Sequence, residues 1–238
     1  MHLTLQPEEP SAAPWTPVPV ADLAARLIDL SGGPGRPLLV AVDGRSASGK
    51  STLSAALATA LGGAPVIHTD DLCWHEPMFA WEHLLREVLT LLRRDGALDF
   101  VPPAWRTRGR SGSITVPPAR PVVLVEGVGS SHREVADLLD VRIWVQSDDS
   151  LAERRGIARD VAEGTNGDAA EAERFWFEWI AAERRFLASD RPWERADLVV
   201  CGTPAEPPPP GTVAVAPGPL GKVSPGSAWW HGPARPAH

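Results

Sequence analysis

The segment from Gly44 to Ser51 carries the clearest chemical signal in this chain. It reads Gly44-Arg45-Ser46-Ala47-Ser48-Gly49-Lys50-Ser51 and matches the pattern G-x-x-x-x-G-K-[ST]. Its glycines let the backbone turn closely around an anion, and consecutive N–H groups can then point at that anion. Lys50 would neutralise terminal phosphates, and the Ser51 hydroxyl would ligate Mg²⁺. With Thr52, this segment predicts a cradle for ATP and Mg²⁺.

Acidic residues follow two predicted strands at positions that could serve the same site. Asp70 and Asp71 come at the end of the strand predicted over 65–70, and Glu126 ends the strand predicted over 121–126. In a doubly wound sheet, ligands bind at the carboxyl ends of the strands, so these acids should face the cradle. Either aspartate could accept the proton of an attacking hydroxyl, and Glu126 could reach Mg²⁺ through water. The alternative is that acids end these strands only because loops are polar.

Three arginines on one predicted helix could add positive charge to the site. Arg155 and Arg159 are spaced i,i+4 and should lie on the same side of the helix, with Arg154 beside them. Guanidinium groups are well shaped to stabilise the charge that develops on phosphoryl oxygens during transfer. The alternative is a solvated helix face, balanced by acids of the same helix.

The elements around these residues alternate between strand and helix. Strands are predicted at 37–43, 65–70, 121–126, 141–146 and 197–201, and helices at 20–30, 51–61, 80–95, 132–139, 151–163 and 171–189. This alternation predicts an α/β fold with a doubly wound parallel sheet covered by helices on both faces. The cradle then lies between a buried strand and a helix, which a chance match to the pattern would not require.

The composition of the chain predicts one domain with unstructured ends. Residues 1–19 are rich in proline and are expected to form a disordered leader, before a domain over 20–202. Residues 203–238 are expected to form a disordered, proline-rich tail. The stretch 96–120 interrupts the strand and helix pattern with prolines, glycines and arginines, so it is predicted to be a surface excursion.

Charge and cysteine content narrow the partners of the protein. A net charge of -7 and a pI near 5.5 argue against nucleic-acid and membrane-surface partners, which need a basic footprint. The two cysteines, Cys73 and Cys201, lie far apart in sequence and predict free thiols in a reducing cytoplasm. The amino-terminal sequence lacks the basic and apolar stretches of a signal peptide, so we expect a cytoplasmic protein. Its oligomeric state is left open.

Together, these motifs resemble the uridine kinase group of P-loop kinases over roughly residues 37–202. The resemblance rests on the glycine loop, the strand ending at Asp70, the Glu126-Gly127 strand end and the Arg-Arg-x-x-x-Arg159 helix. It implies a P-loop kinase fold with a helical lid that closes over ATP and carries Arg154, Arg155 and Arg159. It also implies that Asp70 is the general base for a sugar 5′-hydroxyl and that Glu126 belongs to the Mg²⁺ site.

The sequence departs from this group in the region that should recognise the acceptor. Asp70 is followed by Asp71-Leu-Cys-Trp where the group usually carries Phe and Tyr, and the chain contains no Tyr. Trp105 lies where the acceptor-binding segment is expected and could stack on a base or an apolar acceptor, while Arg106 reads its polar edge. The alternative for Trp105 is a packing anchor.

We therefore expect an ATP-dependent kinase of the uridine kinase type that phosphorylates a nucleoside, with Asp70 as the base. One alternative is a kinase of the same fold for another small alcohol, such as a sugar or a pantothenate-like acceptor. A second alternative is a nucleotide-binding regulatory module or slow NTPase. The acid at position 70 separates these classes, because a kinase needs it and a binding module does not.

Overall fold

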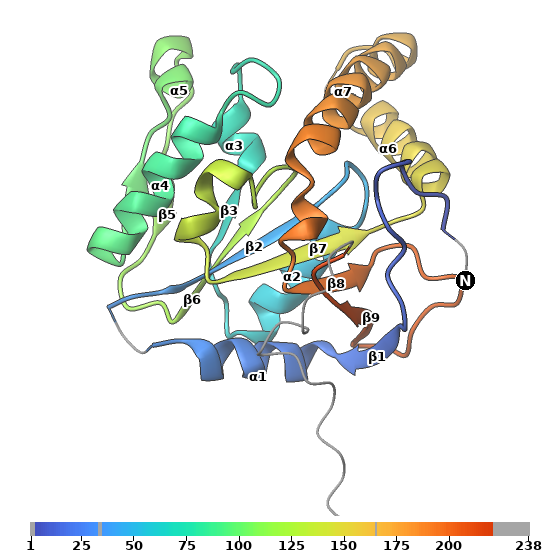
Figure 1. Cartoon of the computed structure of the whole chain (residues 1–238). Helices are drawn as coiled ribbons and strands as arrows, with labels where there is room; N and C mark the ends of the chain where they lie inside the picture. The colour runs from blue at the N-terminus through green and yellow to red at the C-terminus, as the bar shows by residue number, and fades with distance from the viewer. Residues whose placement is uncertain (1–2, 33–34, 165, 221–238) are drawn as a thin grey trace, which may run out of the picture.

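A seven-stranded sheet forms the centre of the computed structural model, which describes residues 3–32, 35–164 and 166–220 (Figure 1). The strand order is β1-β9-β8-β7-β2-β6-β3. The strands are β1 (Thr16–Pro19), β2 (Leu38–Gly44), β3 (Val66–His68), β6 (Val122–Glu126), β7 (Val141–Gln146), β8 (Leu198–Cys201) and β9 (Thr212–Pro217). Neighbours from β8 to β3 are parallel, whereas β9 and β1 complete one edge in antiparallel pairs. The predicted parallel sheet is thus confirmed for its centre.

Helices cover both faces of this sheet. They are α1 (Val20–Leu30), α2 (Lys50–Ala60), α3 (Thr69–Cys73), α4 (Glu82–Asp95), α5 (Pro103–Arg108), α6 (Asp149–Glu163) and α7 (Ala169–Asp190), with 3₁₀ turns η1 (Arg133–Leu138) and η2 (Pro192–Glu194). The side chains of β2 alternate between two cores: Leu39 and Ala41 pack in the core of α4, while Val40 and Val42 pack in that of α1 and α2. Because β2 is buried on both faces, it is apolar throughout rather than alternating.

The stretch 96–120 is more ordered than its sequence indicates. It contains the antiparallel pair β4 (Leu98–Phe100) and β5 (Ile114–Val116), with α5 between them. Leu98, Phe100, Ile114 and Val116 are buried in the core of α4, so this excursion forms one wall of the domain. Single apolar residues among prolines and glycines do not reveal such a short hairpin.

The two ends of the chain also differ from the sequence-based expectation. Residues 3–19 and 203–220 contribute β1 and β9 to the sheet, with Val18 and Val215 buried in the same core as α1. The short alternating run Thr-Val-Ala-Val-Ala of β9 follows a proline-rich stretch that masks its pattern. Proline is tolerated in edge strands, where its missing N–H is not needed. The remainder of the predicted tail, 221–238, lies outside the described residues.

Helices α6 and α7 form a hairpin that stands apart from α3, α4 and α5 in Figure 1. Asp148 caps α6 by accepting a hydrogen bond from Leu151 N, and Asp168 with Glu171 forms a capping box at the start of α7. Gly156 lets the helices approach closely, since a Cβ added there would lie 1.8 Å from the ring of Trp176. In the described part of the chain, no helix has the length and apolar character needed to cross a membrane.

Candidate active site

The glycine loop connects β2 to α2 at the centre of the sheet. Ala47 has φ 57° and Gly49 has φ 101°, so left-handed residues curl the backbone into the concave shape that suits an anion. The first amides of α2 lack partners within the helix and point toward the same space. A Cβ on Gly202 would lie 1.8 Å from the carbonyl oxygen of Ser48, so the chain after β8 supports the loop from behind.

Lys50 is the main positive group inside the cradle. It is 7% exposed, and its Nζ donates a hydrogen bond to the carbonyl oxygen of Arg45 at 2.7 Å. Desolvation raises the pKa values of Asp70 and Glu183, and the positive charge of Lys50 opposes that rise; the same charge helps to hold the pKa of Glu126 below its ordinary value. One ammonium group therefore interacts with three carboxylates. A bound cation would reduce the excess of negative charge that this leaves at the site.

Glu126 and Ser51 form the oxygen pair that the sequence assigned to Mg²⁺. Ser51 Oγ donates to Glu126 Oε1 at 3.0 Å, and His68 Nδ1 lies 2.7 Å from Glu126 Oε2. Burial acts to raise the pKa of Glu126, but His68, Lys50 and Ser51 outweigh it and hold this pKa below its ordinary value. The hydrogen bond to Glu126 raises the pKa of His68.

This pair fits Mg²⁺ by its chemistry. An ionised carboxylate beside a hydroxyl offers hard oxygen ligands, and Mg²⁺ in phosphotransferases takes one or two such ligands together with water and phosphate oxygens. Among the residues that the structure describes, no group of three or more His, Cys, Asp and Glu side chains could hold a metal by itself.

Asp70 lies in the first turn of α3, because β3 ends at His68 rather than at the aspartate. Asp70 is exposed at the surface, but desolvation by the groups packed around it raises its pKa, and Glu126 adds to this rise, while Lys50, His68 and Arg159 oppose it. The carboxyl group is therefore close enough to the cradle to sense both Lys50 and Glu126. This environment suits a general base beside transferring phosphate.

The structure separates the two adjacent aspartates. Asp71 forms an ion pair with Arg110, whose Nη2 lies 2.5 Å from Asp71 Oδ1, and both side chains are about one-third exposed. Arg110 comes from the excursion after α5. The charge of Asp70, by contrast, is coupled to Lys50.

Trp105 is used for packing in this structure, in agreement with the alternative that the sequence left open. It is 5% exposed, and its Nε1 donates to the carbonyl oxygen of Asp71 at 2.9 Å. The guanidinium of Arg110 lies 3.5 Å from the centre of its ring, so that face is covered. Arg106 is exposed on α5.

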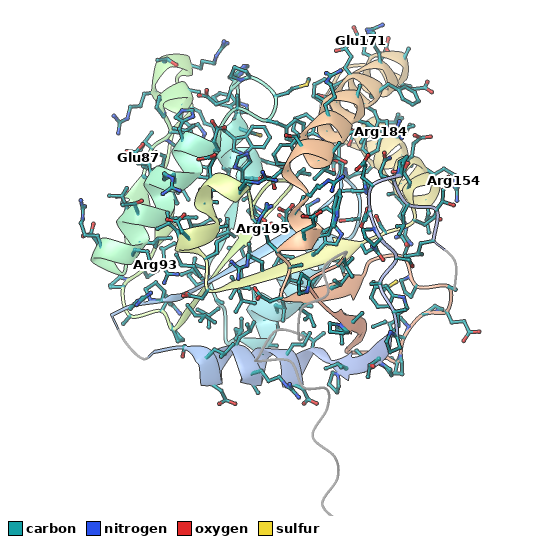
Figure 2. All side chains as sticks on the ribbon, in the orientation of Figure 1. Glu87, Arg93, Arg154, Glu171, Arg184 and Arg195 are labelled. Carbon is teal, nitrogen blue, oxygen red and sulfur yellow. The ribbon has the colours of Figure 1, made fainter. Side chains whose placement is uncertain are left out.

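The three arginines of α6 take different positions. Arg155 Nη1 donates to the carbonyl oxygen of Gly202 at 3.4 Å, beside the loop, and Arg159 lowers the pKa of Asp70 while pairing with Asp160. Arg154 lies on the outer side of α6 in Figure 2, and its charge acts on Asp148 at the start of the helix. Arg155 and Arg159 therefore lie toward the site, and Arg154 does not.

Arg45 points out of the cradle into a buried ion pair. Its Nη2 lies 2.6 Å from Glu9 Oε2, and the other oxygen of Glu9 accepts hydrogen bonds from Trp144 and Gln146. The backbone of Arg45 belongs to the loop, but its side chain ties the loop to the segment before β1. No spacing rule predicts this contact, because Glu9 and Arg45 are distant in sequence.

Asp43, directly before the loop, is a further residue that the sequence analysis missed. Its carboxylate accepts hydrogen bonds from the amides of Gly44, Gly129 and Ser131 and from Ser131 Oγ, at 2.7 to 3.0 Å. Burial raises its pKa, and these hydrogen bonds oppose the rise. Asp43 thereby fixes the turn that follows Glu126.

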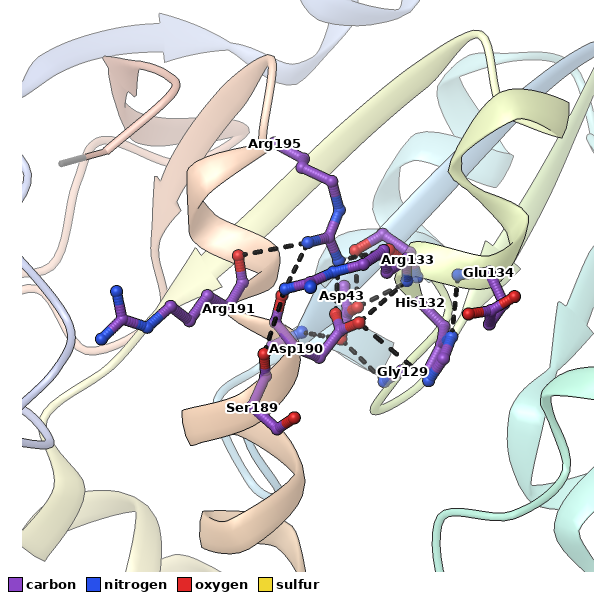
Figure 3. A network of polar contacts seen from close by, with 11 residues as sticks. Asp43, Gly129, His132, Arg133, Glu134, Ser189, Asp190, Arg191 and Arg195 are labelled. Atoms are coloured by element: carbon purple, nitrogen blue, oxygen red, sulfur yellow. Dashed lines mark hydrogen bonds and ion pairs between the residues drawn. The ribbon is translucent and has the colours of Figure 1, made fainter. Parts of the chain in front are cut away.

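A second carboxylate holds the same turn from α7. Asp190 pairs with Arg195 and accepts from Arg133 N at 2.9 Å (Figure 3). Asp70 was selected because it follows a predicted strand, and the same rule applied to β2 would also have selected Asp43. Asp190 lies at the end of a helix, and no sequence rule used here points to it.

Two of the solved structures that are similar to this chain are named as kinases. No protein-family model matches the chain, and no curated protein matches it in sequence. A structure from Silicibacter sp., provisionally named a fructose transport system kinase, is 25% identical, covers 70% of this chain and 94% of its own, and superimposes with a TM-score of 0.51. A second, from Bacillus stearothermophilus and provisionally named a uridine kinase, is 19% identical, with 76% and 96% coverage and a TM-score of 0.44. The chain thus has the P-loop kinase fold, a conclusion that rests on the first of these neighbours.

Proposed function

We propose that this protein is an ATP-dependent phosphotransferase that acts on a small-molecule hydroxyl, and specifically a nucleoside kinase of the uridine kinase type. The observation that carries this proposal is the convergence of Lys50, Asp70 and the Ser51–Glu126 pair on one glycine loop. The 25% identical neighbour with the same fold supports a kinase. A binding module would not need an acid whose charge is coupled to the lysine of the glycine loop.

Each residue has a role that its position supports. The acceptor hydroxyl would transfer its proton to the Asp70 carboxylate as its oxygen attacks the terminal phosphorus of ATP and the bond to the leaving ADP breaks. Lys50 would neutralise the phosphates, and Arg155 and Arg159 would stabilise the charge on the transferred group. Ser51 and Glu126 would hold Mg²⁺, which supplies further charge neutralisation when bound.

A sugar kinase is the second candidate, and one finding favours it. The neighbour from Silicibacter sp. bears the name of a fructose transport system kinase. The substitution of Asp71-Leu-Cys-Trp for the Phe and Tyr of the uridine kinase group is compatible with an acceptor that has no base. A regulatory module or slow NTPase remains the alternative from another class.

An acceptor screen tests these proposals. Purified protein with Mg²⁺ and ATP would be incubated with nucleosides, sugars and pantothenate-like alcohols, and both ADP release and product mass would be measured. We expect a phosphorylated nucleoside and no product with Lys50→Ala. A phosphorylated sugar would select the second candidate, whereas ADP release without any phosphorylated acceptor would indicate an NTPase.

A further inference from the structure

Glu183 on α7 is a buried carboxylate that has no role in the proposed reaction. It is 1% exposed, and its Oε2 accepts hydrogen bonds from Ser46 N at 3.0 Å and from Ser46 Oγ at 2.5 Å. Trp179, one turn earlier on α7, donates from Nε1 to the same Oγ at 2.8 Å. Two side chains of α7 therefore hold the third residue of the glycine loop.

Through its hydrogen bonds to Ser46, Glu183 lies close enough to the glycine loop to be affected by the charge of Lys50. Burial raises its pKa, and the charges of Lys50 and Arg45 act in the opposite direction. Arg45 is already paired with Glu9 at 2.6 Å. Of these two cations, Lys50 is therefore the one that Glu183 and a bound phosphate would both attract. Lys50 is also the group expected to hold the terminal phosphates of a nucleotide.

A carboxylate and a phosphate interact with such a loop through the same groups. Each is an anion that accepts hydrogen bonds from backbone N–H groups and is attracted to a nearby ammonium. Two anions in a buried site repel strongly, because little water is present to screen them. The hydrogen bond of the Ser46 amide is therefore available to one of the two anions at a time.

We propose that the Glu183 carboxylate occupies part of the anion cradle at Ser46 and must be displaced, with α7, when the terminal phosphate of ATP binds. This inference rests on the proposed nucleotide-binding function. It makes α7 an autoinhibitory element whose release is coupled to ATP rather than to ADP, since the competition concerns the terminal phosphate.

The same helix would carry this displacement to the acceptor side of the site. Phe79 follows Asp70 and α3 in the chain, and its ring stacks on Phe186 of α7 at 4.9 Å and contacts Trp179 at 4.9 Å. Phe79 has φ 59°, a strained conformation for a bulky residue that these contacts must hold in place. A shift of α7 would therefore also loosen the segment around Phe79.

Calorimetry on the full chain tests the competition directly. Glu183→Gln keeps the size of the side chain and an acceptor for the Ser46 amide, but it removes the charge. We expect this variant to bind Mg-ATP at least about fivefold more tightly than the wild type, with a smaller gain for Mg-ADP. Glu178→Gln removes an exposed carboxylate from the same helix and should leave both affinities unchanged.

The outcomes separate this inference from the proposed function. Equal or weaker ATP binding by a folded Glu183→Gln variant overturns the competition, because a structural role for Glu183 cannot produce a gain in affinity. If the wild type binds no Mg-nucleotide at all, the proposed function itself fails.

Hydrogen exchange of the wild type gives an independent test should the variant not fold. Mg-ATP should speed the exchange of the α7 amides near Glu183 relative to Mg-ADP, because both anchors at Ser46 are lost. Unchanged or slower exchange there overturns the inference.

Discussion

Asp70 and Asp71 are neighbours in sequence, yet their side chains meet different partners. The charge of Asp70 is coupled to Lys50 and Glu126 at the glycine loop, whereas Asp71 pairs with Arg110 on the excursion side. Two adjacent residues of a helix point about 100° apart, so one can face the cradle while the other faces away from it. The choice between them therefore depends on the start of α3, one residue before Asp70.

Asp70→Asn should lower kcat by about 10² to 10⁴, because the amide cannot accept the acceptor proton. The affinity for Mg-ATP should stay within a few-fold of the wild type, since Lys50 and the loop amides remain. Steady-state kinetics with calorimetry measure both quantities. Asp71→Asn is the matched control, and an equal loss of kcat in that variant would move the base to position 71.

The activity should also depend on pH through Asp70. A base must be deprotonated in the free enzyme, and desolvation by the groups packed around Asp70 raises the pKa of this carboxyl above its ordinary value. The value of kcat/KM should therefore fall as pH decreases through that raised pKa, at a pH above the ordinary aspartate range near ~3.9. A pH profile of kcat/KM measures the midpoint, and a profile that stays flat down to the ordinary aspartate range contradicts the assignment.

At the scale of elements, α6 and α7 act on the site as a pair. Arg184 of α7, labelled in Figure 2, lies 3.1 Å from Asp149 of α6, and Gly156 allows the ring of Trp176 to lie against the α6 backbone. The helix that carries Arg155 and Arg159 and the helix that carries Glu183 are thus closely packed on each other.

Gly156→Ala tests whether the activity depends on this packing. An added Cβ would overlap the ring of Trp176, so the helices must separate by the order of an ångström, and Arg155 and Arg159 would move with α6. We expect kcat/KM to fall by about tenfold or more, since small displacements of charged groups are costly in catalysis. Glu163→Ala, at an exposed position of α6, is the control and should retain activity. Wild-type kinetics in Gly156→Ala would show that the spacing is not needed.

At the scale of the whole molecule, the two ends of the chain close one edge of the sheet. β9 pairs with β8 on one side and with β1 on the other, so β1 reaches the sheet only through β9. The segment before β1 then continues to Glu9, which holds Arg45 of the glycine loop. Through β1 and Glu9, β9 is in this way linked to Arg45 of the glycine loop.

A chain that ends at Thr203 should consequently be less stable than one that ends at Leu220. It loses Val215 and Ala216, which are 0% and 1% exposed, and it leaves β1 without a partner. Burial of one valine contributes roughly 2 kcal/mol, so with the lost strand pairing the melting temperature should drop on the order of 10 °C. Thermal unfolding followed by circular dichroism compares the two chains. Equal melting temperatures would show that β9 adds nothing to the sheet.

The sequence alone predicted the central strands, five of the helices and the residues next to the glycine loop, whereas the helix predicted over 132–139 is the 3₁₀ turn η1, and α3 and α5 were missed. Lys50, Ser51, Asp70 and Glu126 could be selected because strand ends and loop motifs are local features, and parallel strands bring such ends to one edge. The same local rules favoured an α/β fold before any contact was known. They failed at β1 and β9, where prolines in or before the strands obscure short strand patterns.

Only the tertiary structure decided which distant groups meet. Glu9 reaches Arg45, Glu183 reaches Ser46 and His68 reaches Glu126, and no periodicity encodes these pairs. It also placed Trp105 in a buried packing role and turned Arg154 away from the site. The physical reason is that the partners of a buried charge depend on how helices and loops pack in three dimensions, whereas a sequence motif fixes only the geometry of its own segment.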